Sequence, residues 1–197
     1  MKINTFKYFF KFKIITIILF FIISCQPVEK IEKVVFDNNI LPKLIINANK
    51  KSINEIYEMN YVDPYIDHSL ENPPLSRVKD YLTENINIFG TENKLVIKIN
   101  DAQIIKDEIK NNDDKKFQEK TIYEYNINLA VEFLLYDDSE KLLATTIAES
   151  SRSTTSAKYI SINEEERIVD GLILDALIDL TKKIDEMINK HMYQFML

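Results

Sequence analysis

Residues Thr121–Tyr136 alternate apolar and polar side chains almost without a break. The apolar positions are Tyr123, Tyr125, Ile127, Leu129, Val131, Phe133 and Leu135. Because side chains two residues apart in a strand point to the same face, the run predicts one long strand with a buried face and a wet face. Such a strand belongs in an antiparallel sheet that other elements cover on one side only.

The segments on either side of this run also have strand character. Residues 94–100, KLVIKIN, place three apolar side chains on one face, and the pattern continues irregularly to residue 109. A charged stretch at 110–116 predicts a solvated hairpin loop, and the acidic residues 137–140 predict a turn into a further strand at 141–155. The three strands form a predicted meander.

Two stretches have helical spacing. Residues 75–89 carry apolar side chains at steps of three and four, Pro74 suits the first turn, and we expect Gly90 to end the helix. The second helix begins after Ser161, which forms a capping box with Glu164 three residues on. Its apolar stripe runs to His191, and we expect Gly171 to permit close approach to a strand.

The N-terminal part of the domain predicts one more strand. Residues 43–59 alternate in two shifted frames, which indicates a strand interrupted near 49–51 by a bulge or a turn. The predicted fold is therefore an α+β two-layer sandwich of about four mostly antiparallel strands, with two helices on one face. The predicted element order is β-α-β-β-β-α.

The leader has the layout of a bacterial signal peptide. Four lysines precede an uncharged run at residues 14–23, and Ser24 and Cys25 follow it. An uncharged run this short falls below the roughly 20 apolar residues that a membrane-spanning helix needs. We expect a signal peptide at 1–24, a lipidated N-terminus and tether at 25–41, and a single globular domain at 42–197.

Residues 22–25, Ile-Ile-Ser-Cys, resemble the bacterial lipobox. The resemblance implies cleavage between Ser24 and Cys25, a diacylglyceryl group on the Cys25 sulfur and an acyl chain on its amine. Two or three acyl chains hold a protein durably on a bilayer, at about 0.8 kcal/mol per buried methylene. The alternatives are an uncleaved helix and a plain signal with a chance cysteine.

The residue after the cysteine is Gln26 and not aspartate. In enterobacteria-like sorting this implies delivery to the periplasmic face of the outer membrane. In an organism with a single membrane, the cell surface is expected instead.

The mature chain is acidic and contains no second cysteine. Removal of the leader takes away four of the 25 basic residues and none of the 31 acidic ones, which leaves a formal charge of −10. A field of this sign disfavours nucleic acid as a partner. No disulfide can form within one mature chain, so packing must stabilise the domain.

Three residues are candidates for a binding surface. Tyr65 and His68 lie in a proline-stiffened loop at 61–74, which is either a binding surface or a lid over the core. Arg152 lies among hydroxyl side chains near a strand end and offers a fork of donors to a phosphate or carboxylate. The alternative is that Arg152 pairs with Glu164 or Glu165. The acids around His68 match no metal motif, so no metal is predicted.

The chain carries no recognisable catalytic motif. Its two glycines, Gly90 and Gly171, lie in no phosphate-binding loop, dinucleotide fingerprint or nucleophile elbow. The hydroxyl-rich stretch 150–156 has no histidine near it in sequence. We therefore expect a protein that is not an enzyme and has no cofactor beyond the covalent lipid on Cys25.

The element order resembles that of small Gram-negative envelope lipoproteins, including the lipopolysaccharide-assembly lipoprotein and the auxiliary lipoproteins of lipid-trafficking ABC systems. The run 64–68 before Pro73 and Pro74 is also similar to a stretch in alphaproteobacterial lipoproteins, and Ser151-Arg152-Ser153 before an acidic-capped helix is similar to both groups. The resemblance implies an accessory or scaffold in outer-membrane assembly or lipid transport, with an envelope protein partner. The alternative is a lipoprotein that binds lipid or a small solute in a cavity between helices and sheet.

Overall fold

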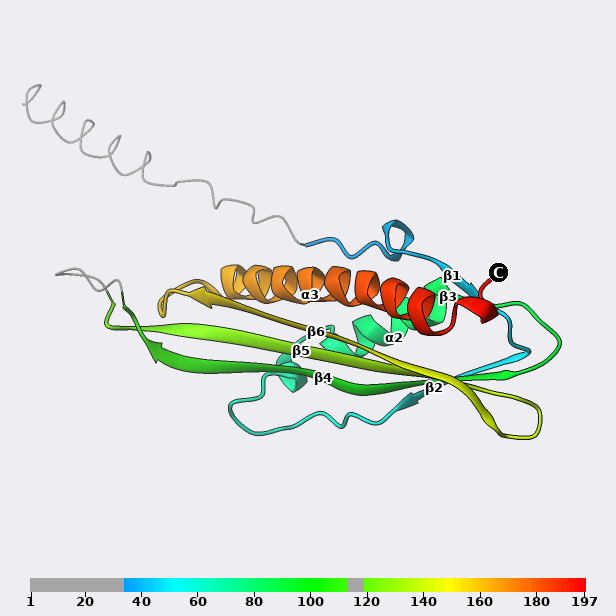
Figure 1. The fold of residues 1–197 in the computed structure, drawn as a ribbon. Coiled ribbons are helices and arrows are strands. Elements are labelled where there is room, and N and C mark those ends of the chain that lie inside the picture. Colours follow the sequence, from blue (N-terminus) through cyan, green and yellow to red (C-terminus); the bar gives the residue numbers. More distant parts are fainter. Residues whose placement is uncertain (1–33, 113–118) are drawn as a thin grey trace, which may run out of the picture. The chain divides into compact units, whose positions relative to one another are not determined.

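The computed structural model describes residues 34–112 and 119–197, and these form an α+β domain of two sheets and two long helices (Figure 1). The larger sheet has the order β2-β4-β5-β6, and the smaller one pairs β1 with β3. The strands are β1 (Leu44–Ile46), β2 (Lys50–Glu55), β3 (Ile86–Ile88), β4 (Lys94–Lys110), β5 (Thr121–Tyr136) and β6 (Leu142–Ser156). The helices are α2 (Pro74–Asn85) and α3 (Ile162–His191), with short 3-10 turns η1 (Asn38–Ile40), η2 (Asp67–Ser69) and η3 (Tyr193–Phe195).

The predicted meander is present as β4, β5 and β6. Both pairs are antiparallel, and β5 has the bounds that its alternation predicts. The irregular continuation of the first strand is a register shift between Ile99 and Asp101, beyond which β4 stays paired with β5 to Lys110. An added residue of this kind bends a strand without ending it.

The N-terminal strand differs from the prediction. Residues 43–59 form two strands in different sheets, and β2 runs parallel to β4. The Lys51 ammonium donates hydrogen bonds to the carbonyls of Leu82, Thr83 and Ile86, at 3.2, 3.0 and 2.6 Å. A cation at this position satisfies the last carbonyls of α2 and favours its negative end. Because the predicted order has one strand before the first helix and none directly after it, it lacks β1 and β3.

The first helix ends earlier than predicted, at Asn85 instead of residue 89. The buried Asn85 amide donates to the carbonyls of Asn38, Leu41 and Pro42, and Ile86 is extended and pairs with Leu44 in β1. Tertiary hydrogen bonds thus end the helix, and Gly90 lies beyond β3. A Cβ on Gly90 would meet the Asn47 side chain and lie 3.0 Å from the Ala48 backbone nitrogen, so a glycine fits this close approach.

The two helices and the sheet share one core. Buried apolar side chains of α2 and α3 pack with alternate residues of β4 and β5, such as Ile97, Ile127 and Val131. Figure 1 shows α3 extending along the sheet. The opposite face of β5 carries half-exposed residues such as Asn126, Asn128 and Glu132, so it is the wet face.

The start of α3 follows the predicted cap. Ser161 Oγ accepts a hydrogen bond from the Glu164 N–H at 3.2 Å, and Glu164 and Glu165 occupy the first turn. These acids complement the positive end of the helix dipole. The expectation for Gly171 is wrong, because a Cβ placed there would have no atom of another element within 4 Å.

Part of the segment predicted as a tether is packed on the domain. Phe36 contacts the core, and the Arg77 guanidinium lies 3.5 Å from the centre of its ring. Leu41 is a buried core residue. In the described ranges, no helix is long and apolar enough to cross a bilayer.

Candidate functional site

The predicted lipidation and cleavage residues, Ser24 and Cys25, lie outside the described residues. Their roles stay predictions. The other predicted site residues, Tyr65, His68 and Arg152, are all described.

Tyr65 and His68 lie beside β4. Tyr65 forms an antiparallel bridge with Ile105, and it is half-buried. His68, in η2, is exposed; its Nδ1 lies 3.0 Å from the Asn60 carbonyl, and its ring centre lies 5.6 Å from that of Tyr61 in a tilted contact. The contacts of both residues are with their own loop and its neighbouring strand.

Arg152 is engaged by α3. Its Nε donates to Asp179 Oδ2 at 2.6 Å, so the predicted pairing with Glu164 or Glu165 is wrong. The hydrogen bond and charge of Asp179 raise the pKa of Arg152, and those of Arg152 lower the pKa of Asp179. The guanidinium therefore holds α3 to β6.

The structure does not bring these three residues into one site. Tyr65 pairs with Ile105 in β4, which pairs with Asn126 in β5, which pairs in turn with Ser153, next to Arg152. Three strand spacings separate the two ends of this row, roughly 14 Å. Tyr65 and Arg152 lie at opposite edges of the sheet.

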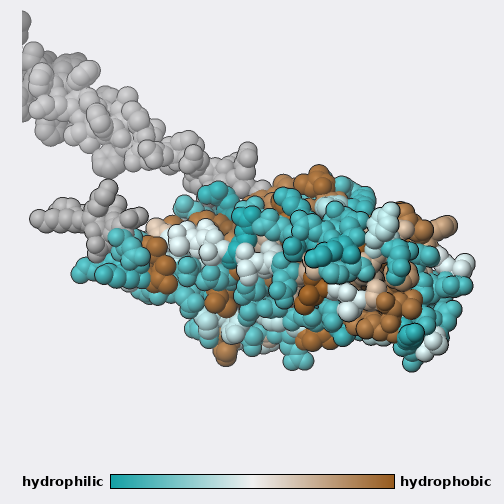
Figure 2. Space-filling view, in the orientation of Figure 1, coloured by the Kyte–Doolittle hydropathy of each residue, from teal (hydrophilic) through white to brown (hydrophobic). Residues whose placement is uncertain are grey.

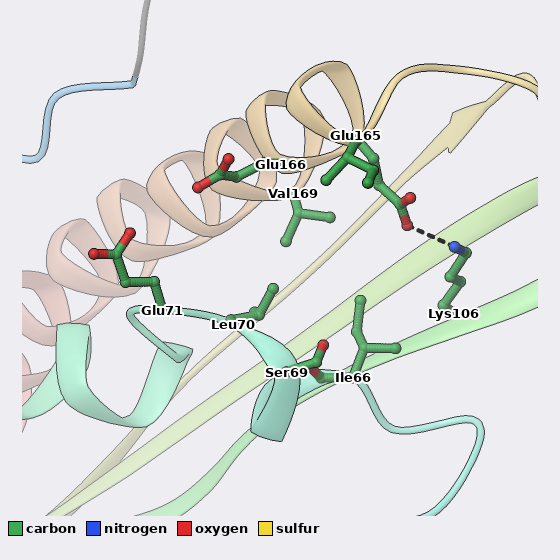
Figure 3. A pocket seen from close by; sticks show the side chains of 9 residues that line it. Ile66, Ser69, Leu70, Glu71, Lys106, Glu165, Glu166 and Val169 are labelled. Atoms are coloured by element: carbon green, nitrogen blue, oxygen red, sulfur yellow. Dashed lines mark hydrogen bonds and ion pairs between the residues drawn. The ribbon is translucent and has the colours of Figure 1, made fainter.

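A pocket of about 400 Å³ lies between the first turns of α3, the loop at 66–71 and β4 (Figure 3). Ile66, Leu70 and Val169 form apolar walls. Lys106, Glu165, Glu166 and Glu71 supply charge around them. In Figure 3, Val169 points from α3 into this space, and Lys106 reaches up from the sheet to Glu165.

The charged side of the pocket is a compact network. Lys106 Nζ lies 2.5 Å from Glu165 Oε1, which also accepts a hydrogen bond from the Tyr125 hydroxyl at 2.9 Å. The ammonium lies 4.1 Å from the ring centre of Tyr123, a cation–π distance.

The network sets the charge of its members. Burial is the largest single influence and disfavours both charged forms, but the hydrogen bonds and charges of the neighbouring groups together outweigh it. The pKa of Lys106 is therefore raised and the pKa of Glu165 lowered. Burial, followed by the bond to Glu165, raises the pKa of Tyr125 against the opposing effect of Ser156. Lys106 and Glu165 are thus held as an ion pair.

A buried contact fixes the loop beside the pocket. Asp67 is 1% exposed, and its Oδ2 accepts from the Tyr57 hydroxyl at 2.8 Å. Burial, followed by this bond, raises the pKa of Tyr57 well above its ordinary value. Asp67 Oδ1 has no hydrogen-bond partner among the described residues. The contact joins the loop to the segment that follows β2.

Two polar side chains that line the pocket are engaged by other groups. Ser69 Oγ donates to the Ile66 carbonyl at 2.7 Å, and Lys106 is held protonated, so neither is arranged as an activated nucleophile. Within residues 34–112 and 119–197, no three His, Cys, Asp or Glu side chains are placed to hold a metal ion.

Sequence reasoning missed Lys106 and Glu165. One signal was available, because Lys106 takes an inward position of β4, after Ala102 and Ile104 on the same face. An inward lysine needs a partner. The partner lies 59 residues away, and sequence spacing does not reveal it.

No protein-family model matches the chain, and no curated protein matches it. Several solved structures are similar. A minor lipoprotein from Acinetobacter baumannii has a TM-score of 0.36 and 15% identity over 72% of this chain and 90% of that one. A DUF330 protein from Xanthomonas campestris has a TM-score of 0.34 and 10% identity, over 79% of this chain and 96% of that one. Rare lipoprotein B from Shewanella oneidensis has a TM-score of 0.33 and 13% identity, over 70% of this chain and 95% of that one. At these scores and identities, the likeness carries no conclusion about function.

Proposed function

We propose that this protein is a non-enzymatic, lipid-anchored envelope protein that serves as an accessory or scaffold in outer-membrane assembly or lipid transport. The observation that carries the proposal is the position of Cys25. It is the only cysteine of the chain, and it directly follows an uncharged run and a small residue. Lipidation requires a thiol at this position. Gln26 after it favours the periplasmic face of the outer membrane as the destination.

The described domain supports an action through its surface. Buried side chains fill the space between the helices and the sheet. Exposed apolar residues are spread over the surface, with Ile45, Phe89 and Leu197 on the small β1–β3 sheet and its C-terminal neighbour. Figure 2 shows such apolar patches among polar ones. A filled core with exposed apolar surface favours protein contacts over enclosure of a ligand.

Mass spectrometry of the mature N-terminus tests the anchor. We expect a Cys25 peptide that carries diacylglyceryl and acyl groups, and we expect Cys25→Ser to leave the membrane fraction or keep its leader. A dominant unmodified peptide across residues 20–30 would contradict the proposal. Crosslinking from membranes with Cys25 intact then tests the accessory role, with recovery of an envelope assembly or transport component as the expected result.

The pocket favours a second candidate function, the binding of a lipid or small solute. Its volume of about 400 Å³ falls within the range of roughly 300–1,000 Å³ for small-molecule sites. Native mass spectrometry of the wild type and of Val169→Trp, which fills the space, tests this function. A ligand lost only in the variant supports it, and Ile147→Trp, at the far edge of the sheet, is the control.

A further inference from the structure

The large sheet ends in the short strand β2 on one side and in the long strand β6 on the other. Beyond β2, the chain that follows it covers the edge of β4. Tyr57 N–H donates to Ile99 O at 3.0 Å, Ile66 N–H to Ile104 O at 3.0 Å, and Lys106 N–H to Pro64 O at 2.9 Å. On the other side, β6 pairs with β5 and with no further strand of the described residues.

The open edge carries few of the features that proteins use to block strand addition, namely the charged side chains of Glu149 and Arg152. Residues 142–156 contain no proline and no lysine, and the register shift next to them lies at the hairpin end, between Leu135 and Tyr136. Natural edge strands are commonly protected by such residues, by bulges or by short length. β6 is long and regular, so it remains competent to pair.

A groove reaches around this edge. About 380 Å³ of space is lined by Thr145, Thr146 and Ile147 of β6, by Glu132, and by Met187 and His191 of α3. Adjacent strand residues point to opposite faces, so a hollow that touches three in succession lies at the edge backbone. Thr146 is 6% exposed, and its hydroxyl has no hydrogen-bond partner in the described part of the chain.

The charge along the edge identifies the kind of partner. β6 carries two charged residues, Glu149 and Arg152, and Arg152 faces Asp175 and Asp179 of α3. Lys182 of α3 also acts on Asp179, so three acids face two bases and the edge is left with one net negative charge. A second copy of this chain, with its own acidic edge, is repelled there, whereas a basic segment is attracted.

We propose that β6 binds an extended basic segment of another protein, which adds to the sheet as a fifth strand. Backbone hydrogen bonds to β6 supply affinity, an apolar side chain enters the groove beside Thr146 and Met187, and a lysine or arginine on the opposite face lies against Glu149. The proposal names the docking surface of the accessory role and rests on that role.

Synthetic peptides test the proposal on the full mature protein in detergent. The probe alternates valine with lysine, and a matched peptide replaces lysine with glutamate. We expect the lysine peptide to bind about tenfold more tightly, and Glu149→Lys to reduce this preference at least about fivefold. Glu92→Lys, an equal charge reversal on an exposed loop, should leave the preference unchanged.

Hydrogen exchange locates the bound peptide. We expect slower amide exchange along β6, and loss of binding when a central valine of the peptide is replaced by proline. Equal binding of the two peptides, an equal effect of both charge reversals, or binding without slowed exchange in β6 would overturn the proposal. Because peptide binding is also measured on Cys25→Ser, a failed anchor and a failed docking surface give different results.

Discussion

Replacement of Lys106 by methionine tests the network at the pocket. The substitution keeps most of the buried stem and removes the charge that pairs with Glu165 at 2.5 Å and lies over Tyr123 at 4.1 Å. The two paired side chains are 23% and 33% exposed, so the pair lies between a surface and a buried one. Surface pairs contribute about 0.2–1 kcal/mol and a cation–π contact about 0.5–1 kcal/mol.

We therefore expect Lys106→Met to lower the free energy of unfolding by about 1–2 kcal/mol at neutral pH. For a domain of this size, each kcal/mol corresponds to about 2–4 °C in Tm, so the expected loss is about 2–8 °C. Urea and thermal denaturation followed by circular dichroism measure both quantities on the mature protein.

The loss of unfolding free energy in Lys106→Met must depend on pH in a defined direction. The pKa of Glu165 is lowered in the folded state, so its stabilisation is present above the ordinary glutamate pKa and is lost as pH falls through the folded value. The pKa of Lys106 is raised, so its stabilisation is lost only as pH rises through a value above 10.5. The penalty of Lys106→Met should thus be constant near neutral pH and shrink towards about pH 3.

Lys98→Met is the matched control. Lys98 lies on the same strand and pairs with Glu132 at 3.3 Å, with similar exposure of both side chains. We expect its penalty to be smaller than that of Lys106→Met, at about 0.2–1 kcal/mol, the range of exposed pairs. Equal penalties for the two variants, or a penalty of Lys106→Met that persists at about pH 3, would refute the account of the network.

Further predictions concern the backbone. Gly90→Ala should destabilise the domain by about 1–2 kcal/mol, because its Cβ would displace the Asn47 side chain and lie 3.0 Å from the Ala48 backbone nitrogen, whereas Gly171→Ala should stabilise it by up to about 1 kcal/mol, since the site is open and helical. Asn85→Ala should cost about 2–3 kcal/mol, because three backbone carbonyls lose their buried donor. Urea midpoints measure all three, and a Gly171→Ala variant less stable than the wild type would contradict the first comparison.

Contacts between residues that are far apart in the chain limit what the sequence can predict. β5 and the cap of α3 were predictable, because alternation over sixteen residues and a serine three residues before a glutamate are local signals. β1 and β3 were not, because each has three residues and finds its partner about 40 residues away. The end of α2 depends on Asn85, whose acceptors lie in a segment that the sequence shows only as a tether.

The candidate site was harder to predict for the same reason. Tyr65, His68 and Arg152 are each recognisable by residue type, but the width of the sheet keeps Arg152 apart from the other two. The pocket depends on Lys106 and Glu165, which are unremarkable in an acidic chain with 25 basic residues until the fold brings them together.

The lengths of the elements explain where the domain is open. α3 has 30 residues and β5 has 16, which correspond to about 45 Å of helix and about 53 Å of strand. The helix therefore falls short of the sheet, and the loop at 66–71 completes the covering layer beside the N-terminal turns of α3, where the pocket lies. The other opening follows from strand order, because the meander ends at β6 and α3 returns over its face without pairing with its edge. A solute in the pocket must slow amide exchange in the first turns of α3, and an added strand must slow it in β6, so one exchange experiment separates the two functions.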